Sequence, residues 1–285
     1  MRARLIVSAI LFAAFCGSIV MLVMDLRDRD PIKLGPTRET SAWTETIAPT
    51  NFPGYLPNTL PPQIPQVIPT SPAGVFSLTD WKLTLPSGGD EPDEVDQPKL
   101  ATFQDPRYFH VDPVGGGVVF RAPVGGATTA NSSYPRSELR EMADGGKKEA
   151  SWSGKKGTHV MTITEAVTAL PKKKPEVVAG QIHDDEDDVV MLRLNGTKLF
   201  VESDSDSVGV LDPAYQLGTR FTVQFVVTPG LIRVTYNGTK TLGLKRKGSG
   251  YYFKAGCYTQ SNEDDHDGNV YGEVVVYSLS VQHTA

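Results

Sequence analysis

Residues 189–202, VVMLRLNGTKLFVE, carry the clearest folding signal in the chain. Two runs rich in β-branched and apolar residues flank Asn195-Gly196. This dipeptide suits the tight turn of a β-hairpin because both of its residues tolerate positive φ. The pattern therefore predicts two antiparallel strands, at 189–194 and 197–202.

Short runs broken by turn residues continue on both sides of this hairpin. They predict further strands at 159–167, 221–227, 231–236, 251–260 and 270–281. Pro229-Gly230 and Asn237-Gly238 supply turns between three of them. No helical periodicity of useful length is visible. Many short strands at regular spacing predict an all-β sandwich or jelly roll, and one domain at 73–285 explains them better than two.

The N-terminus carries an export signal. A basic start precedes an uncharged run at 5–24, about the length needed to cross a bilayer, and charges return at Asp25. No small-x-small cleavage site precedes those charges, and Phe15 is too large for the residue before a lipoprotein cysteine. We therefore expect residues 1–29 to be a signal or, by slight preference, a retained membrane anchor. The rest of the protein would then be secreted or held outside the cytoplasm.

A proline-rich segment follows at 30–72, where ten of the chain's 21 prolines lie. Such a segment forms neither helix nor central strand and buries little surface. We expect an extended, disordered linker, and a tail without any role is also compatible with this composition.

Composition narrows the function classes. The formal net charge is −5, which gives no indication of nucleic-acid binding, so a site for an acidic sugar must be locally basic. Cys16 lies in the N-terminal run, so no disulfide is expected within the domain. No CxxC or HExxH pattern is present, and we expect no metal or other cofactor. We expect a monomer.

Three strand-like segments carry polar residues that alternate onto one face. In 136–140, RSELR, this face holds Arg136, Glu138 and Arg140. A glutamate between two arginines would orient both guanidinium groups, each of which can bind a carboxylate with two hydrogen bonds. The alternative is an exposed, salt-bridged strand face.

The second and third segments add groups that can transfer protons. Gln181 and His183 share a face of 180–183, GQIH, while Ile182 points into the core. In 252–260, YFKAGCYTQ, one face is polar and the other apolar. The polar face carries Tyr252, Lys254, Tyr258 and Gln260. Cys257 lies on the apolar face, as a small core residue would.

Together the three segments resemble the signature segments of the alginate lyases of polysaccharide lyase family 7, in the same order and spacing. The stretches at 81–86 and 131–134 are similar too, so the resemblance covers about residues 75–285. It implies a jelly roll of two curved antiparallel sheets with a substrate cleft on the concave face. It also implies that the partner is the acidic polysaccharide alginate, cleaved by β-elimination without a cofactor.

The resemblance also implies the site. The catalytic group would be Arg136, Gln181, His183 and Tyr258. Substrate would be bound by Arg140, Lys254, Gln260, Glu138 and Asn131. Isoleucine at the position of Ile182 is associated in the family with guluronate-containing chains, so we expect that preference.

The implied chemistry divides the work between two groups. In guluronate the C5 proton and O4 lie on opposite faces of the ring, so His183 would act as base and Tyr258 as acid. In mannuronate both lie on one face, and Tyr258 would serve both steps.

One feature fits a polyanion binder poorly: the acidic run at 184–188, DDEDD. We expect a solvated loop away from the cleft, with a calcium-dependent loop or a specificity element as alternatives. Three other functions stay open: a lyase for another polyuronate such as glucuronan, a non-catalytic carbohydrate-binding jelly roll, and a glycoside hydrolase using Glu138.

Overall fold

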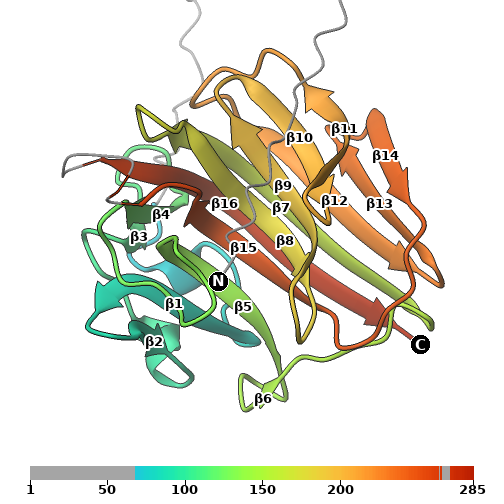
Figure 1. The fold of residues 1–285 in the computed structure, drawn as a ribbon. Helices are drawn as coiled ribbons and strands as arrows, with labels where there is room; N and C mark the ends of the chain where they lie inside the picture. The colour runs from blue at the N-terminus through green and yellow to red at the C-terminus, as the bar shows by residue number, and fades with distance from the viewer. Residues whose placement is uncertain (1–67, 263, 265–269) are drawn as a thin grey trace, which may run out of the picture. The chain divides into compact units, whose positions relative to one another are not determined.

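Two antiparallel sheets make up the computed structural model, which describes residues 68–262, 264 and 270–285 (Figure 1). The first sheet runs in the order β11 (Asp206–Asp212), β10 (Lys198–Ser203), β9 (Asp188–Asn195), β8 (Glu176–His183), β15 (Tyr252–Thr259), β5 (Arg136–Ala143), β1 (Trp81–Gly88), β2 (Pro92–Val95), with β6 (Lys148–Glu149) beside β5. The second runs β14 (Lys240–Leu244), β13 (Leu231–Tyr236), β12 (Phe221–Thr228), β7 (Thr158–Ala169), β16 (Tyr271–Thr284), β4 (Val118–Pro123), β3 (Phe109–Val111).

The predicted all-β jelly roll is confirmed. The hairpin at 189–202 forms β9 and β10, with Lys198 opposite Asn195 and Gly196 in the turn at φ 59°. The two C-terminal strands each enter the middle of a sheet: β15 lies between β8 and β5, and β16 between β7 and β4. Each sheet therefore pairs neighbouring strands that are far apart in the chain.

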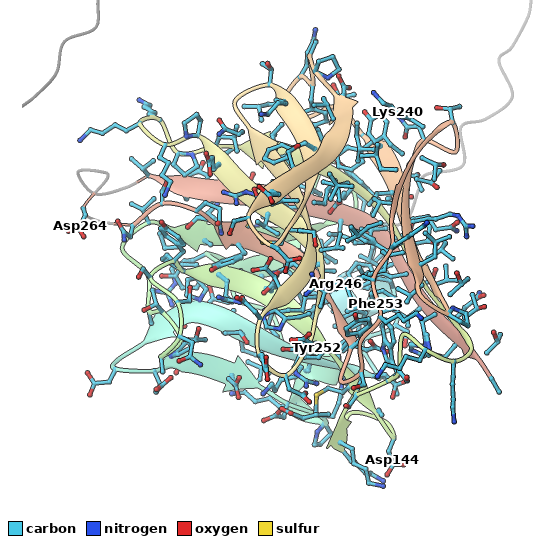
Figure 2. All side chains as sticks on the ribbon, turned by 45° about the vertical axis from the view of Figure 1, so that its right-hand side comes forward. Asp144, Lys240, Arg246, Tyr252, Phe253 and Asp264 are labelled. Carbon is cyan, nitrogen blue, oxygen red and sulfur yellow. The ribbon has the colours of Figure 1, made fainter. Side chains whose placement is uncertain are left out.

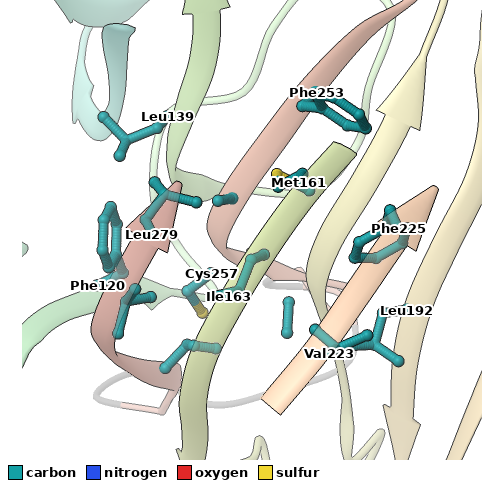
Figure 3. Packing of buried hydrophobic residues seen from close by; sticks show 14 of the residues in the cluster. Phe120, Leu139, Met161, Ile163, Leu192, Val223, Phe225, Phe253, Cys257 and Leu279 are labelled. Atoms are coloured by element: carbon teal, nitrogen blue, oxygen red, sulfur yellow. The ribbon is translucent and has the colours of Figure 1, made fainter. Parts of the chain in front are cut away.

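Apolar side chains from both sheets meet in one core. Phe120, Leu139, Ile163 and Phe225 come from strands of both sheets and are fully buried (Figure 3). Burying each such side chain stabilises the fold by about 1.5–3 kcal/mol. Cys257 faces this core, as predicted, and burial raises the pKa of its thiol.

The predicted N-terminal segment at 1–29 and almost all of the linker at 30–72 lie outside the described residues. Within the described ranges, no helix has the length and apolar character needed to cross a bilayer.

Glu165 on β7 is an exception in the apolar core. It lies opposite the core residues Phe221 and Val276, it is fully buried, and neither carboxylate oxygen has a hydrogen-bond partner among the described residues. Burial raises the pKa of Glu165 well above its usual range. The folded protein therefore holds the carboxyl proton to higher pH than the unfolded chain does.

We expect Glu165→Met to stabilise the fold, because it replaces an unpartnered carboxyl with an apolar side chain of similar length. The gain should be about 1–3 kcal/mol at pH 7. Since the folded pKa is raised, wild-type stability falls as pH rises above the unfolded value, so the gain should shrink near pH 4. Urea unfolding at both pH values measures it, with the exposed Glu91→Gln as control. If the Glu165→Met variant is less stable than wild type at pH 7, Glu165 has a stabilising partner.

Candidate active site

A cleft of about 330 Å³ opens on the face of the first sheet that is turned away from the core. Seven of the nine predicted site residues line it: Arg136, Gln181, His183, Tyr258, Arg140, Lys254 and Asn131.

The strand pairing explains why these residues meet. Lys254 on β15 lies opposite Arg140 on β5 and opposite Gln181 on β8. Farther along β15, Tyr252 lies opposite His183 and Tyr258 opposite Arg136. The three sequence segments are thus three adjacent strands.

A bulge in β8 sets the direction of its two functional side chains. The register with β9 shifts between Val178 and Gly180. A Cβ on Gly180 would lie 3.1 Å from Ile163 and 3.3 Å from Phe225 in the core. The next residues alternate, so Gln181 faces the cleft and the fully buried Ile182 faces the core, as predicted.

Glu138 lies beneath the cleft and organises it. Its carboxylate is 2.7 Å from Lys254 Nζ and 3.3 Å from Arg136 Nη1, and it accepts a hydrogen bond from the Gln181 amide. Burial by itself would raise the pKa of Glu138, but the Lys254 and Arg136 cations hold it below its usual range. Glu138 is buried and, unlike Gln181, is not among the residues that line the cleft, so the structure gives no support to the prediction that it binds substrate. It holds three donors in place instead.

Lys254 supplies a positive charge at the centre of the cleft. Burial lowers the pKa of Lys254 to about 8, although the Glu138 carboxylate opposes this shift. The ammonium is therefore charged at neutral pH and available to a uronate carboxylate.

His183 is held by hydrogen bonds to one ring nitrogen. Its Nδ1 lies 2.6 Å from the Asp184 carbonyl oxygen and 3.0 Å from Tyr252 Oη. A carbonyl only accepts, so Nδ1 carries the hydrogen. Burial and the nearby Lys254 charge lower the pKa of His183, so the ring is neutral at neutral pH. Its Nε2 then keeps a lone pair and can act as a base.

Arg136 and Tyr258 lie against each other in the cleft. The Arg136 guanidinium carbon lies 3.9 Å from the centroid of the Tyr258 ring, and Tyr258 Oη is 2.9 Å from Ser132 Oγ. Arg136 Nε is buried and has no hydrogen-bond partner among the described residues.

Arg140 is oriented differently from the prediction. Glu138 does not pair with it, because Lys254 from β15 occupies that position. The Arg140 guanidinium donates to the Glu141 carbonyl oxygen at 2.6 Å and pairs with Glu149 at 3.1 Å. Its carbon lies over the Tyr252 ring, 4.0 Å from the ring centroid.

Gln260 is not among the residues that line the cleft, so the prediction for it fails. Its side chain is buried, and its amide donates to the Thr259 carbonyl oxygen at 3.1 Å. β15 ends at Thr259, and the alternation that would have carried Gln260 to the polar face ends with it.

The acidic run is also placed differently from the prediction. Asp185, Glu186, Asp187 and Asp188 line the cleft and are not directed away from it. Asp184 holds the loop, since its Oδ1 accepts from two loop amides and its carbonyl positions His183. Burial, reinforced by the Asp187 charge, raises the pKa of Asp188 to about 6. In the described ranges, no group of three or more His, Cys, Asp or Glu side chains is arranged to hold a metal ion.

Some cleft residues were not predicted from the sequence: Lys82, Thr84, Glu94, Thr129, Ser132 and Tyr252. Alternation along β1 does contain a signal for two of them. Lys82 and Thr84 lie opposite Arg140 and Glu138 on β5, while Trp81, Leu83 and Leu85 face the core. Tyr252 shares the polar face of β15, and Figure 2 labels it beside the core residue Phe253.

Comparison with known proteins gives a consistent result. A family described as alginate lyase matches residues 76–283. An alginate lyase from Klebsiella pneumoniae is 26% identical over 75% of this chain and 92% of its own length.

Solved structures agree. The alginate lyase AlgAT5 from polysaccharide lyase family 7 is 49% identical, with a TM-score of 0.74, over 75% of this chain and 99% of its own. An alginate lyase from Corynebacterium sp. is 46% identical, also with a TM-score of 0.74, over 76% and 100%. The family 7 lyase A1-II′, as a His-to-Asn and Tyr-to-Phe variant in complex with substrate (GGMG), is 31% identical, with a TM-score of 0.65, over 76% and 97%. The chain therefore belongs to the alginate lyases of polysaccharide lyase family 7.

Proposed function

We propose that this alginate lyase prefers guluronate-containing chains and cleaves them by β-elimination, with His183 as base and Tyr258 as acid. The observation that carries the proposal is the His183 ring, which is neutral and tied through Nδ1 so that Nε2 is available. Tyr258 lies six residues along β15 from Tyr252, the residue opposite His183. Both side chains line the same cleft, and the proposed reaction uses them on opposite faces of the bound sugar.

The carboxylate receptor makes the C5 proton removable. That proton is barely acidic until the adjacent carboxylate is neutralised, and the donors of Arg136, Gln181 and Lys254 surround this position. His183 Nε2 takes the proton, the electron pair forms the C4–C5 double bond, and the bond from C4 to O4 breaks. The departing O4 takes its proton from the Tyr258 hydroxyl.

Two features support these roles and the preference. The substrate complex of the related lyase A1-II′ was obtained with a variant that lacks one histidine and one tyrosine. Ile182 is packed in the core directly between Gln181 and His183, where its shape influences how both side chains meet the sugar. The hydrolase alternative is disfavoured because Glu138 is buried, ion-paired and of lowered pKa, and so cannot act as a general acid.

Initial rates on poly-guluronate, poly-mannuronate and glucuronan test the proposal. They are followed by the ultraviolet absorbance of the new double bond, with and without chelator. We expect the highest rate on poly-guluronate or mixed blocks, and no effect of the chelator. A higher rate on poly-mannuronate or glucuronan would contradict the preference.

The acidic run should weaken binding of a polyanion at low salt. We expect the triple variant Asp185→Asn, Glu186→Gln, Asp187→Asn to lower KM for alginate by about 10-fold at low ionic strength, with kcat unchanged. The difference should disappear near 1 M salt, where charges are screened within about 3 Å. Asp184 is kept because it holds His183.

A matched control removes three exposed acids outside the cleft: Asp90→Asn, Glu91→Gln, Asp206→Asn. It should leave KM within about twofold of wild type, because these acids lie outside the cleft and the interaction between charges weakens with distance. If both triple variants lower KM equally, only net charge matters. If the loop variant raises KM, the run binds substrate, directly or through a cation.

We further propose that the protein acts as a monomer outside the cytoplasm, secreted or held by its N-terminal segment. The support is the uncharged run at 5–24 followed by the proline-rich spacer. N-terminal sequencing of exported protein decides between the two forms: a start downstream of Met24 would contradict a retained anchor.

A further inference from the structure

A second group of titratable side chains lies on the opposite face of β5 from the cleft. Glu141 is 3% exposed, and its Oε1 lies 2.6 Å from His283 Nε2. His283 Nδ1 lies 2.7 Å from His159 Nδ1. We refer to Glu141, His283 and His159 as the histidine latch.

The hydrogen bonds of the latch fix where its protons are. His159 Nε2 faces two carbonyl oxygens, of Ser153 at 3.2 Å and Lys156 at 3.0 Å, so this nitrogen carries a hydrogen. Burial lowers the pKa of His159, so its ring is neutral and its Nδ1 is an acceptor. His283 Nδ1 must then donate to His159, and one proton lies between His283 Nε2 and Glu141 Oε1.

Other charged and polar groups surround the latch. The adjoining cavity is lined by Asp80, which precedes β1, and by Asp144 in the turn after β5. From β15, the Phe253 amide reaches Glu141. Trp152 stacks on His159 with 4.1 Å between the ring centroids and donates its indole N–H to Glu141 Oε2 at 3.0 Å. Among the described residues, no lysine or arginine pairs with Glu141.

The latch joins the second sheet to the strand that carries the cleft residues. His159 on β7 and His283 on β16 are paired across the second sheet. The ladder between β15 and β5 extends to Lys254 and Arg140, and the next amide of β15, Phe253 N–H, donates to Glu141 Oε2 at 2.9 Å. Glu141 therefore adds a side-chain hydrogen bond to β15 where its ladder with β5 ends, beside the backbone pairing of Phe253 with Ile182 on β8.

This end of β15 contacts the proposed catalytic base, His183. Phe253 lies between Tyr252 and Lys254, which both line the cleft. Tyr252 Oη is 3.0 Å from His183 Nδ1, and their rings are stacked with centroids 5.3 Å apart. Displacing Phe253 would move Tyr252, and with it the ring of His183.

We propose that His283 is a positioning residue whose hydrogen bond to Glu141, passed on through the Phe253 amide, keeps Tyr252 and His183 in their reactive arrangement. The inference rests on the catalytic role proposed above for His183. His283 itself touches neither substrate nor reacting atoms. Its effect should therefore appear in kcat and not in KM, because the carboxylate receptor of Arg136, Gln181 and Lys254 is anchored separately, by Glu138.

The test compares full-length wild type, His283→Gln and the control His110→Gln on poly-guluronate. His110 lies on β3, outside both the latch and the cleft. We expect His283→Gln to lower kcat by about 10- to 100-fold with KM within about twofold, as a small displacement of a catalytic group does. His110→Gln should change neither constant. Unchanged kcat in His283→Gln, or a KM that rises as far as kcat falls, would overturn the proposal.

A second measurement needs no variant. Nitrogen-15 NMR of the wild-type imidazoles at pH 7 should show a hydrogen on Nε2 of His159 and a hydrogen on Nδ1 of His283. A His283 without a hydrogen on Nδ1 would overturn the proposal even if His283→Gln failed to fold. The proposed mechanism and the role of the latch can be refuted separately. If His183→Ala keeps full activity, the proposed mechanism is wrong. If His183→Ala is inactive but His283→Gln has wild-type activity, only the role of the latch is wrong.

Discussion

Tyr258→Phe is expected to abolish cleavage of both poly-guluronate and poly-mannuronate. The phenol is the proposed acid for guluronate and the proposed acid and base for mannuronate, and removal of its oxygen leaves the departing O4 without a proton. Losing a positioned acid or base costs on the order of 10²- to 10⁴-fold in rate. Since the ring and its contact with Arg136 remain, KM should change little.

Tyr134→Phe is the matched control. The Tyr134 ring lies 6.4 Å from that of Tyr258, and its hydroxyl accepts from Lys174 at 2.8 Å outside the cleft lining. It should retain near wild-type kcat on both polymers. A Tyr258→Phe protein that kept more than about a tenth of wild-type kcat would remove Tyr258 from the mechanism.

His183→Ala should separate the two polymers. Guluronate needs a base on the face of the sugar opposite the acid, and the neutral His183 ring is the group proposed for it. Cleavage of poly-guluronate should fall by about 10²- to 10⁴-fold. Poly-mannuronate should lose far less, since Tyr258 can serve both steps there. The measurement is the ratio of the poly-guluronate rate to the poly-mannuronate rate, with His110→Ala as the control variant. If both activities fall by the same factor, His183 serves the carboxylate site in general and the division of labour is wrong.

Alternation allowed most of the strands and their faces to be predicted from the sequence. A side chain's face is a local property with a period of two, so Arg136, Gln181 and Lys254 could each be assigned to the polar face of its own segment. That the three segments form one site was implied only by the resemblance to the family 7 lyases. The same logic fails where a strand ends, as at Gln260, because alternation requires continued strand geometry.

Long-range pairing was beyond local patterns. The insertion of β15 between β8 and β5 makes Lys254 an ion-pair partner of Glu138, whereas the sequence predicts Arg140 as that partner. The histidine latch was missed for the same reason, since Glu141, His159 and His283 are far apart in the chain. The acidic run was misplaced because a charged loop is usually solvated, and only the fold shows that this one borders the cleft.

The central claim is β-elimination, and the most direct test is its stoichiometry on poly-guluronate. Each cleavage should create one C4–C5 double bond, so ultraviolet absorbance and new reducing ends should rise one to one. The ratio should stay the same in the presence of a chelator. Reducing ends that appear without absorbance would mean hydrolysis and would contradict the account.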